Sequence, residues 1–182
     1  MDILAHGLWA GAAAQALRRA GRPVRVRAAV AWGVAPDLVA FGPLFAFLLL
    51  GLAQGGLTWA QFADPESMAR PPWDGHPVFR LTSALYRLGH SAVIFAAVFA
   101  ATWVWRGRPH WEMGGWGLHI LLDIPTHARS FYPTPFLWPV SEWTFDGVSW
   151  AVPWALALNY AALAAAWAWL RRGRHVKAGE AG

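Results

Sequence analysis

The stretch GWGLHILLDIPTH, residues 115–127, places ionisable side chains in an otherwise apolar segment. His119, Asp123 and His127 stand four residues apart, so a continuous helix would present all three along one face. Imidazole nitrogen and carboxylate oxygen are ligands that zinc, manganese and iron accept in proteins. A His-x-x-x-Asp pair on one helical turn therefore predicts two metal ligands held in a preset geometry.

Further polar side chains lie within other apolar segments, namely His6, Asp37 and His90, with Ser91 beside the last. At membrane depth, ionisable groups cost several kcal/mol each unless they are paired, solvated or bound to metal. One shared cavity would satisfy all of them together, so we expect these side chains to converge. A metal with an open coordination position lowers the pKa of bound water. A metal-bound water of this kind is a nucleophile at neutral pH, so the predicted chemistry is hydrolysis of an ester or phosphoester at the membrane surface.

The composition indicates a membrane protein. Hydrophobic residues make up 57% of the 182, charged residues make up 14%, and 14 residues are tryptophan. The apolar residues occur in blocks of roughly 18 to 26, and about 20 are needed to cross a bilayer core. Cysteine is absent, which excludes disulfides and thiolate metal ligands. We therefore expect an all-α fold, a polytopic membrane bundle of about five helices with one short or kinked.

The elements that must position these side chains are five predicted membrane spans, at residues 3–20, 28–53, 81–105, 111–128 and 151–170. They form a single membrane-embedded helical domain over residues 1–170, followed by a basic cytoplasmic tail over residues 171–182. Pro125 lacks a backbone N–H and should end or kink the fourth span. Asp123 and His127 would then turn into the cavity, with freed backbone carbonyls near water or the metal.

The two longer loops differ in character: the first is expected to be an interfacial loop, and the second allows two interpretations. Residues 54–80 contain prolines, glycines and tryptophans, and residues 129–150 are richer still in aromatic residues and proline. Such a composition is typical of an aromatic belt at the membrane surface. The other interpretation is a lid or a lipid-contacting rim over a site, because Glu142 and Asp146 again stand four residues apart.

The basic residues predict the orientation in the membrane. Eleven of the 15 arginines and lysines lie between spans one and two, between spans three and four, and after span five. With five crossings these segments share one side, which the positive-inside rule makes cytoplasmic. The amino terminus is then outside. The net charge of +5 reflects topology and contact with anionic lipid, and nucleic-acid binding is not expected.

Other interpretations of the same residues stay open. A histidine in a helix is more often part of a structural hydrogen bond than a metal ligand, and an aspartate after proline often caps a helix or forms a turn. His90 and His119 could together bind haem. A proton or ion pathway is a stronger rival, because carboxylates and histidines also form relays.

The chain also resembles a known family through the stretches DILAHGLW, GVAPDLVAF, LYRLGHS, LHILLDIPTH and FLWPVSEWTFDG. In this order they resemble the bacterial membrane-bound metal-dependent hydrolases, some described as LexA-binding inner-membrane hydrolases, over most of the chain to Trp150. That family is distantly similar to zinc-dependent phospholipase C, whose helical core holds a metal cluster with a His-x-x-x-Asp motif. The resemblance implies an inner-membrane location. It also implies metal-site positions at His6, Asp37, His90, His119 and Asp123.

The chain departs from the family pattern at two places. Many members have a second aspartate where this chain has Val39. Many also have a histidine and a threonine leading into His-Ser, where this chain has Tyr86, Arg87 and Gly89. Fewer ligands imply one metal ion, or none, rather than a cluster.

Residues and resemblance together predict a membrane-bound metal-dependent hydrolase acting on a phosphoester or lipid ester. Zinc is the expected metal, with manganese or iron as alternatives. The acid or base would be His127 or Glu142, and Ser91 would hydrogen-bond a ligand. The rival is a non-enzymatic membrane protein that binds or transports an ion or protons, and membrane lipid is the expected partner. The predicted metal ligands are His6, Asp37, His90, His119 and Asp123.

We predict that the carboxyl terminus is cytoplasmic, because basic residues concentrate in the segments named above. A reporter that is active only in the periplasm should be inactive when fused at Gly173. The same reporter inserted in the loop 129–150 should be active. Periplasmic activity of the Gly173 fusion would overturn the orientation, and with it the expectation that the site opens outward.

Overall fold

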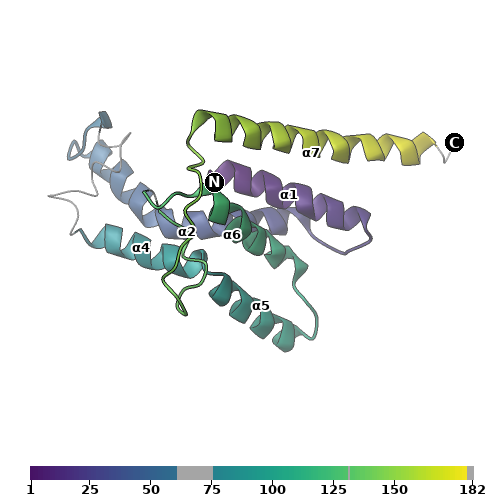
Figure 1. The fold of residues 1–182 in the computed structure, drawn as a ribbon, viewed down its shortest axis with the longest axis horizontal. Coiled ribbons are helices and arrows are strands. Elements are labelled where there is room, and N and C mark those ends of the chain that lie inside the picture. The colour runs from purple at the N-terminus through teal and green to yellow at the C-terminus, as the bar shows by residue number, and fades with distance from the viewer. Residues whose placement is uncertain (61–75, 131, 180–182) are drawn as a thin grey trace.

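The computed structural model describes residues 1–60, 76–130 and 132–179 of the chain (Figure 1). Within these residues the fold has six α-helices, one short 3₁₀ helix and no strand, which confirms the all-α prediction for this part of the chain. The elements are α1 (Ile3–Arg19), α2 (Val26–Ala53), α4 (Pro77–Gly89), α5 (Ala92–Arg106), η2 (Trp111–Met113), α6 (Gly114–Thr126) and α7 (Pro153–Gly179).

One described helix, α2, is long and apolar enough to cross a membrane. α4 and α5 pass the same test only when they are taken as one span, and the two are bent by 59°. Length and composition of the described helices therefore support one crossing, or two when the bent pair is counted. The five-span bundle and its multi-pass topology stay predictions.

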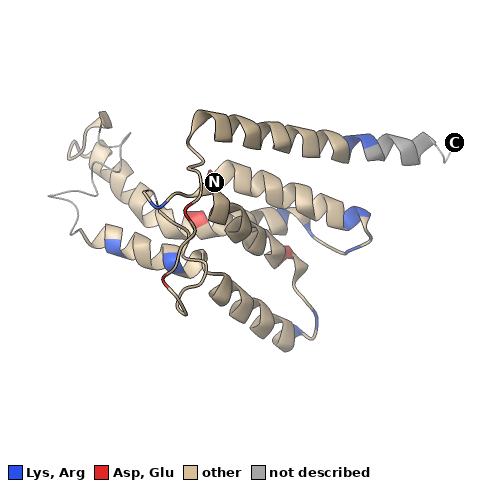
Figure 2. Ribbon diagram, in the orientation of Figure 1, with Lys and Arg blue, Asp and Glu red and all other residues tan. Residues whose placement is uncertain are grey.

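The outer faces of the helices carry large apolar side chains. Leu50 of α2 is 60% exposed, and Val104 and Trp105 near the end of α5 are 83% and 85% exposed. The basic segments after α1, after α5 and along α7 lie toward the same end of the molecule (Figure 2). The predicted orientation in a membrane requires such a grouping.

Small residues set the packing of α1 against α2. Asp2 caps α1, where its side chain accepts a hydrogen bond from the Ala5 N–H at 2.9 Å. Further along, a Cβ added at Gly33 of α2 would lie 2.6 Å from the Cβ of Ala10 and 3.1 Å from the carbonyl oxygen of His6. Without side-chain bulk at this contact the two backbones approach closely, which brings His6 against α2.

The third predicted span is not one continuous helix, because the chain breaks between α4 and α5. Ser91 adopts an extended backbone and caps α5, where its hydroxyl accepts a hydrogen bond from the Ile94 N–H at 3.0 Å. The next N–H, that of Ala92, donates to the carbonyl of Phe136 in the loop before α7 at 2.9 Å. Cap and loop thus supply hydrogen bonds at the break, where His90 is fully buried.

Pro125 lies in the last turn of α6, which ends at Thr126 as predicted. The Val148 N–H donates to the Pro125 carbonyl at 3.0 Å. The Gly147 N–H donates to the His127 carbonyl at 2.9 Å. The loop before α7 thus supplies hydrogen-bond donors to these two carbonyls, and the expectation that freed carbonyls lie near water or the metal stays a prediction.

α7 lies along α1 (Figure 1). Leu163 of α7 packs in one buried cluster with Met1 and Ala5. The indole N–H of Trp9 donates to the Asn159 side-chain oxygen at 2.9 Å. The helix continues without a break past residue 170, where the basic tail was expected to begin, as far as Gly179.

α6 approaches the backbone of α2 closely at Gly115. A Cβ at this position would lie 2.2 Å from the carbonyl oxygen of Ala29 and 3.0 Å from the backbone nitrogen of Gly33. A neighbouring helical residue, Gly114, has open space around its added Cβ. The glycine at 115 therefore fixes how deeply α6, with its His119, sits against α2.

We predict that Gly115→Ala lowers the free energy of unfolding by about 1 to 3 kcal/mol, because overpacking at a backbone contact forces the helices apart. Gly114→Ala is the matched control, since it brings the same gain in helix propensity without a clash. Thermal unfolding of the two purified variants in detergent measures the difference. Equal stability of the two variants would show that the close approach at Gly115 is not a constraint.

Candidate metal site

The structure brings the five residues predicted as metal ligands into the interior. The relative exposure of each is 4% or less. Ligand atoms of four of them, Asp37, His90, His119 and Asp123, all lie within 4.8 Å of one another. This group could hold a metal ion. His6 lies alongside it and stacks on His119, with ring centroids 3.7 Å apart.

Separate elements deliver these side chains. His119 and Asp123 stand one turn apart on α6, as their spacing predicted. Asp37 follows Pro36 inside α2, and His90 caps the end of α4 at the break between α4 and α5. The group thus depends on the positions of α2, α4 and α6 relative to one another, and on α1 for His6.

The distances within the group are those of atoms around a common centre. Nε2 of His119 lies 3.2 Å, and Nε2 of His90 lies 3.4 Å, from Oδ2 of Asp123. The same two nitrogens lie 3.7 and 3.3 Å from Oδ1 of Asp37, and 3.0 Å from each other. For comparison, two tetrahedral ligands about 2.1 Å from a zinc ion stand roughly 3.4 Å apart.

The backbone orients both central imidazoles. Nδ1 of His119 lies 2.7 Å from the carbonyl oxygen of Gly33, and Nδ1 of His90 lies 3.0 Å from that of Tyr86. A carbonyl oxygen only accepts, so each Nδ1 carries the hydrogen and donates it. In neutral rings the two Nε2 atoms then present lone pairs toward each other and toward the carboxylates. This arrangement, in which the far nitrogen is fixed by a carbonyl, is typical of metal-binding histidines.

Several polar atoms of the group lack hydrogen bonds within the described part of the chain. They are both ring nitrogens of His6 and the Oδ2 atoms of Asp37 and Asp123. Nε2 of His6 lies 2.9 Å from Oδ1 of Asp123, yet it makes no hydrogen bond. A buried polar atom left unpaired costs about 1 to 3 kcal/mol. The group is therefore costly unless a cation or additional protons occupy its centre.

His127, predicted as an acid or base, borders the group and is 5% exposed. Its Nε2 lies 3.8 Å from Oδ1 of Asp123 and 3.1 Å from the amino group of Met1, which also contacts that carboxylate oxygen. Its Nδ1 lies 2.9 Å from the hydroxyl of Tyr86 and 3.4 Å from that of Thr134. His127 is thus held on both nitrogens at the edge of the site.

The structure does not bring the other two candidates into the group. The Glu142 side chain is 69% exposed and pairs with Nη1 of Arg87 at 3.3 Å. Ser91, expected to hydrogen-bond a ligand, instead caps α5 and donates to the carbonyl of Trp138. Asp146 accepts a hydrogen bond from the Arg129 N–H at 2.8 Å in an exposed position. Glu142 and Asp146 therefore bind surface groups.

Sequence reasoning assigned no role in the site to Tyr86, Thr134 or the Met1 amino group. Tyr86 is 4% exposed, and its hydroxyl donates to the carbonyl of Tyr132 at 2.9 Å besides contacting His127. Its position one turn before His90 was a usable signal, because side chains four apart share a helix face. Thr134 lies in an irregular loop, where spacing carries no such signal.

A second polar group at the other end of α6 has ordinary ion pairing. Oε1 of Glu112 accepts hydrogen bonds from the backbone N–H and Nε of Arg25, at 3.3 and 3.0 Å. Oε2 of Glu112 lies 3.3 Å from Nε2 of His110. Here a guanidinium supplies the positive charge. Among the described ion pairs of the buried group, Asp123 pairs with the Met1 amino group and with histidines, and Asp37 pairs with histidines.

No protein-family model, no curated protein and no solved structure matches this chain. The function is therefore inferred from the geometry of the site and from the sequence.

We predict that Tyr86→Phe lowers the free energy of unfolding by about 1 to 3 kcal/mol, because it removes a buried hydroxyl that serves His127 and the Tyr132 carbonyl. Tyr160→Phe is the control, since its hydroxyl donates to Asp2 at 3.0 Å in a partly exposed position. Chemical denaturation of both variants provides the measurement. A loss no larger than that of Tyr160→Phe would show that the Tyr86 hydroxyl is not part of a buried network.

Proposed function

We propose that the protein is a membrane-bound, metal-dependent hydrolase of the inner membrane that acts on a phosphoester or lipid ester. The observation that carries the proposal is the convergence of two imidazole Nε2 atoms and two buried carboxylates within 4.8 Å. Their orientation makes the facing atoms acceptors, and a divalent cation is the partner that satisfies all of them together. The motif order that resembles membrane-bound metal-dependent hydrolases supports the same function.

The residues fit such a cation by their chemistry. Asp37, His90, His119 and Asp123 would hold it, and His6 would add a nitrogen ligand or orient Asp123. This nitrogen and oxygen set suits zinc, manganese or iron, and zinc is our choice because imidazole-rich sites of few ligands favour it. When bound, the metal supplies Lewis acidity that makes water a nucleophile at neutral pH.

His127 is the residue best placed to move a proton. Its Nε2 faces the site at 3.8 Å from Asp123. Its Nδ1 is held by Tyr86, and this hydrogen bond fixes the orientation of the ring. A general acid or base must hold such a fixed position near the reacting groups. We assign this role to His127 and not to Glu142, which points to Arg87 at the surface.

A proton or ion pathway is the second candidate. The separation of 3.0 Å between Nε2 of His90 and Nε2 of His119 is also a hydrogen-bond distance. A proton shared between these rings would replace the cation and turn the group into one step of a relay. The metal content of the purified protein distinguishes the two functions.

We predict that the purified protein contains about one equivalent of zinc, manganese or iron per chain. Asp123→Asn and His119→Ala should lose most of this metal, because one removes a charge and the other a ligand. Hydrolysis of bis(p-nitrophenyl) phosphate should fall roughly a hundredfold in both variants and in chelator-treated wild-type protein. Added zinc should restore the activity of the wild-type protein and not that of the variants.

The matched controls are Asp146→Asn and His110→Ala, which change an exposed aspartate and a histidine of the Glu112 group. Both should keep full metal content and activity. Wild-type protein without metal, or unchanged metal in Asp123→Asn, would contradict the metal site and favour the relay. Metal without hydrolysis of phosphodiesters or lipid esters would leave a metal-binding protein and refute the hydrolase.

A further inference from the structure

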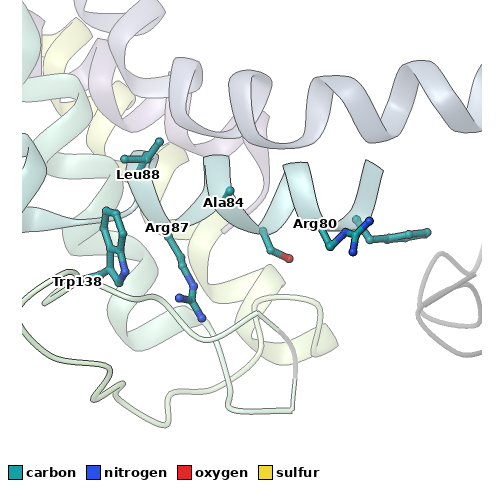
Figure 3. A pocket seen from close by; sticks show the side chains of 7 residues that line it. Arg80, Ala84, Arg87, Leu88 and Trp138 are labelled. Carbon is teal, nitrogen blue, oxygen red and sulfur yellow. The ribbon is translucent and has the colours of Figure 1, made fainter. Parts of the chain in front are cut away.

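An open pocket lies on the outer face of α4, apart from the buried metal group (Figure 3). Its volume is about 500 Å³. Apart from Trp138, which the loop before α7 contributes, all its lining residues belong to α4. They are Phe79, Arg80, Ser83, Ala84, Arg87 and Leu88.

Two arginines make the polar side of this pocket cationic. Arg80 and Arg87 stand seven residues apart, which is roughly 10 Å along a helix and close to two full turns. The hydroxyl-bearing Ser83 lies between them on the same face. Figure 3 shows Arg87 beside Trp138, with Arg80 further along the helix. Guanidinium groups of this kind bind phosphate oxygens through paired N–H donors.

The charge of the pocket is only partly neutralised. Arg87 pairs with Glu142 at 3.3 Å, but both side chains are at least half exposed. An exposed pair of this kind contributes little free energy and is readily exchanged for a better anion. Among the described residues, no carboxylate lies within ion-pair distance of Arg80. Within the described part of the chain, Arg80 therefore has no carboxylate partner, and Arg87 has only a weak one in Glu142.

The remaining lining is apolar. Phe79, Leu88 and Trp138 contribute hydrophobic surface, and Leu88 is 43% exposed. An indole beside a guanidinium is the combination that membrane proteins place at the level of lipid headgroups. Such a pocket matches a ligand with an anionic phosphate next to an apolar portion, and a free inorganic anion would leave the apolar surface unused.

We propose that this pocket binds the headgroup of an anionic phospholipid, with Arg80 and Arg87 donating to its phosphate. The glycerol and first acyl carbons lie against Leu88 and Trp138. The site is separate from the metal group, and lipid binding there needs neither metal nor hydrolysis. α4 nevertheless connects the two sites, because Arg87 and Leu88 lie between Tyr86 and His90 in one helical turn.

The test titrates dioctanoyl phosphatidylglycerol into the purified full chain in non-ionic detergent and counts bound lipid by native mass spectrometry. The double variant Arg80→Gln/Arg87→Gln should weaken binding roughly tenfold to a hundredfold, because it removes both charged donors. Arg106→Gln/Arg108→Gln is the matched control with two arginines removed elsewhere, and its affinity should match wild type. Glu142→Gln should bind about two- to threefold more tightly, since it frees Arg87.

Four further measurements make the result decisive. Arg80→Lys/Arg87→Lys keeps the charge and should retain part of the affinity, and a thermal melt reports whether each variant is folded. Inorganic phosphate at millimolar concentration should not displace the lipid, and full displacement would mean a simple anion site. Unchanged lipid binding in the folded Arg80→Gln/Arg87→Gln protein would overturn the proposal. Asp123→Asn should bind lipid normally, so loss of metal and loss of lipid are separate outcomes.

Discussion

The architecture of this protein depends on an electrostatic constraint, which is that two carboxylates and several imidazoles are buried together in one interior. Asp123 is fully buried and lies within 3.4 Å of nitrogens from His6, His90 and His119. Because the outer nitrogens of His90 and His119 are held by carbonyls, their inner nitrogens present lone pairs toward each other and toward the carboxylates, of which Asp123 also contacts the Met1 amino group. A cation bound among these atoms would contribute its binding free energy to folding, as in other proteins whose ligands form no site in the unfolded chain.

The backbone meets this constraint by allowing unusually close approach. Gly33 packs directly against the methyl group of Ala10, and Gly115 packs directly against the carbonyl of Ala29. Because neither glycine has a side chain, α1, α2 and α6 approach one another closely. At the end of α6, a Cβ at Gly147 would lie 2.3 Å from the carbonyl oxygen of Pro125. That contact lets the loop before α7 cover the helix end. Gly33 and Gly115 lie one helical turn before Asp37 and His119, and Gly147 packs against the backbone of His127. Local backbone packing therefore determines the geometry of the site.

The sequence predicted the parts of the site that follow from regular helices. His119 and Asp123 were placed on one face by their spacing, and the cost of isolated charges in apolar segments predicted that His6, Asp37 and His90 would join them. The break at Ser91 was not predicted, because the residues on both sides of it have the composition of one apolar span. The carbonyls of Phe136 and Trp138, which accept hydrogen bonds from Ala92 and Ser91 at the break, belong to a loop that is distant in sequence. The same kind of long-range contact places Glu142 against Arg87, which spacing within the loop cannot predict.

The break between α4 and α5 has a consequence beyond positioning His90. In a straight span both faces of α4 would continue into α5, whereas the 59° bend separates a short amphipathic helix from an apolar one. One side of α4 can then carry Thr82 and Tyr86 toward the interior while the adjacent side carries arginines outward. Charged side chains are tolerated on such a helix only where they reach water or lipid headgroups. The bend therefore allows one short helix to position a buried histidine and to present cationic groups at the surface.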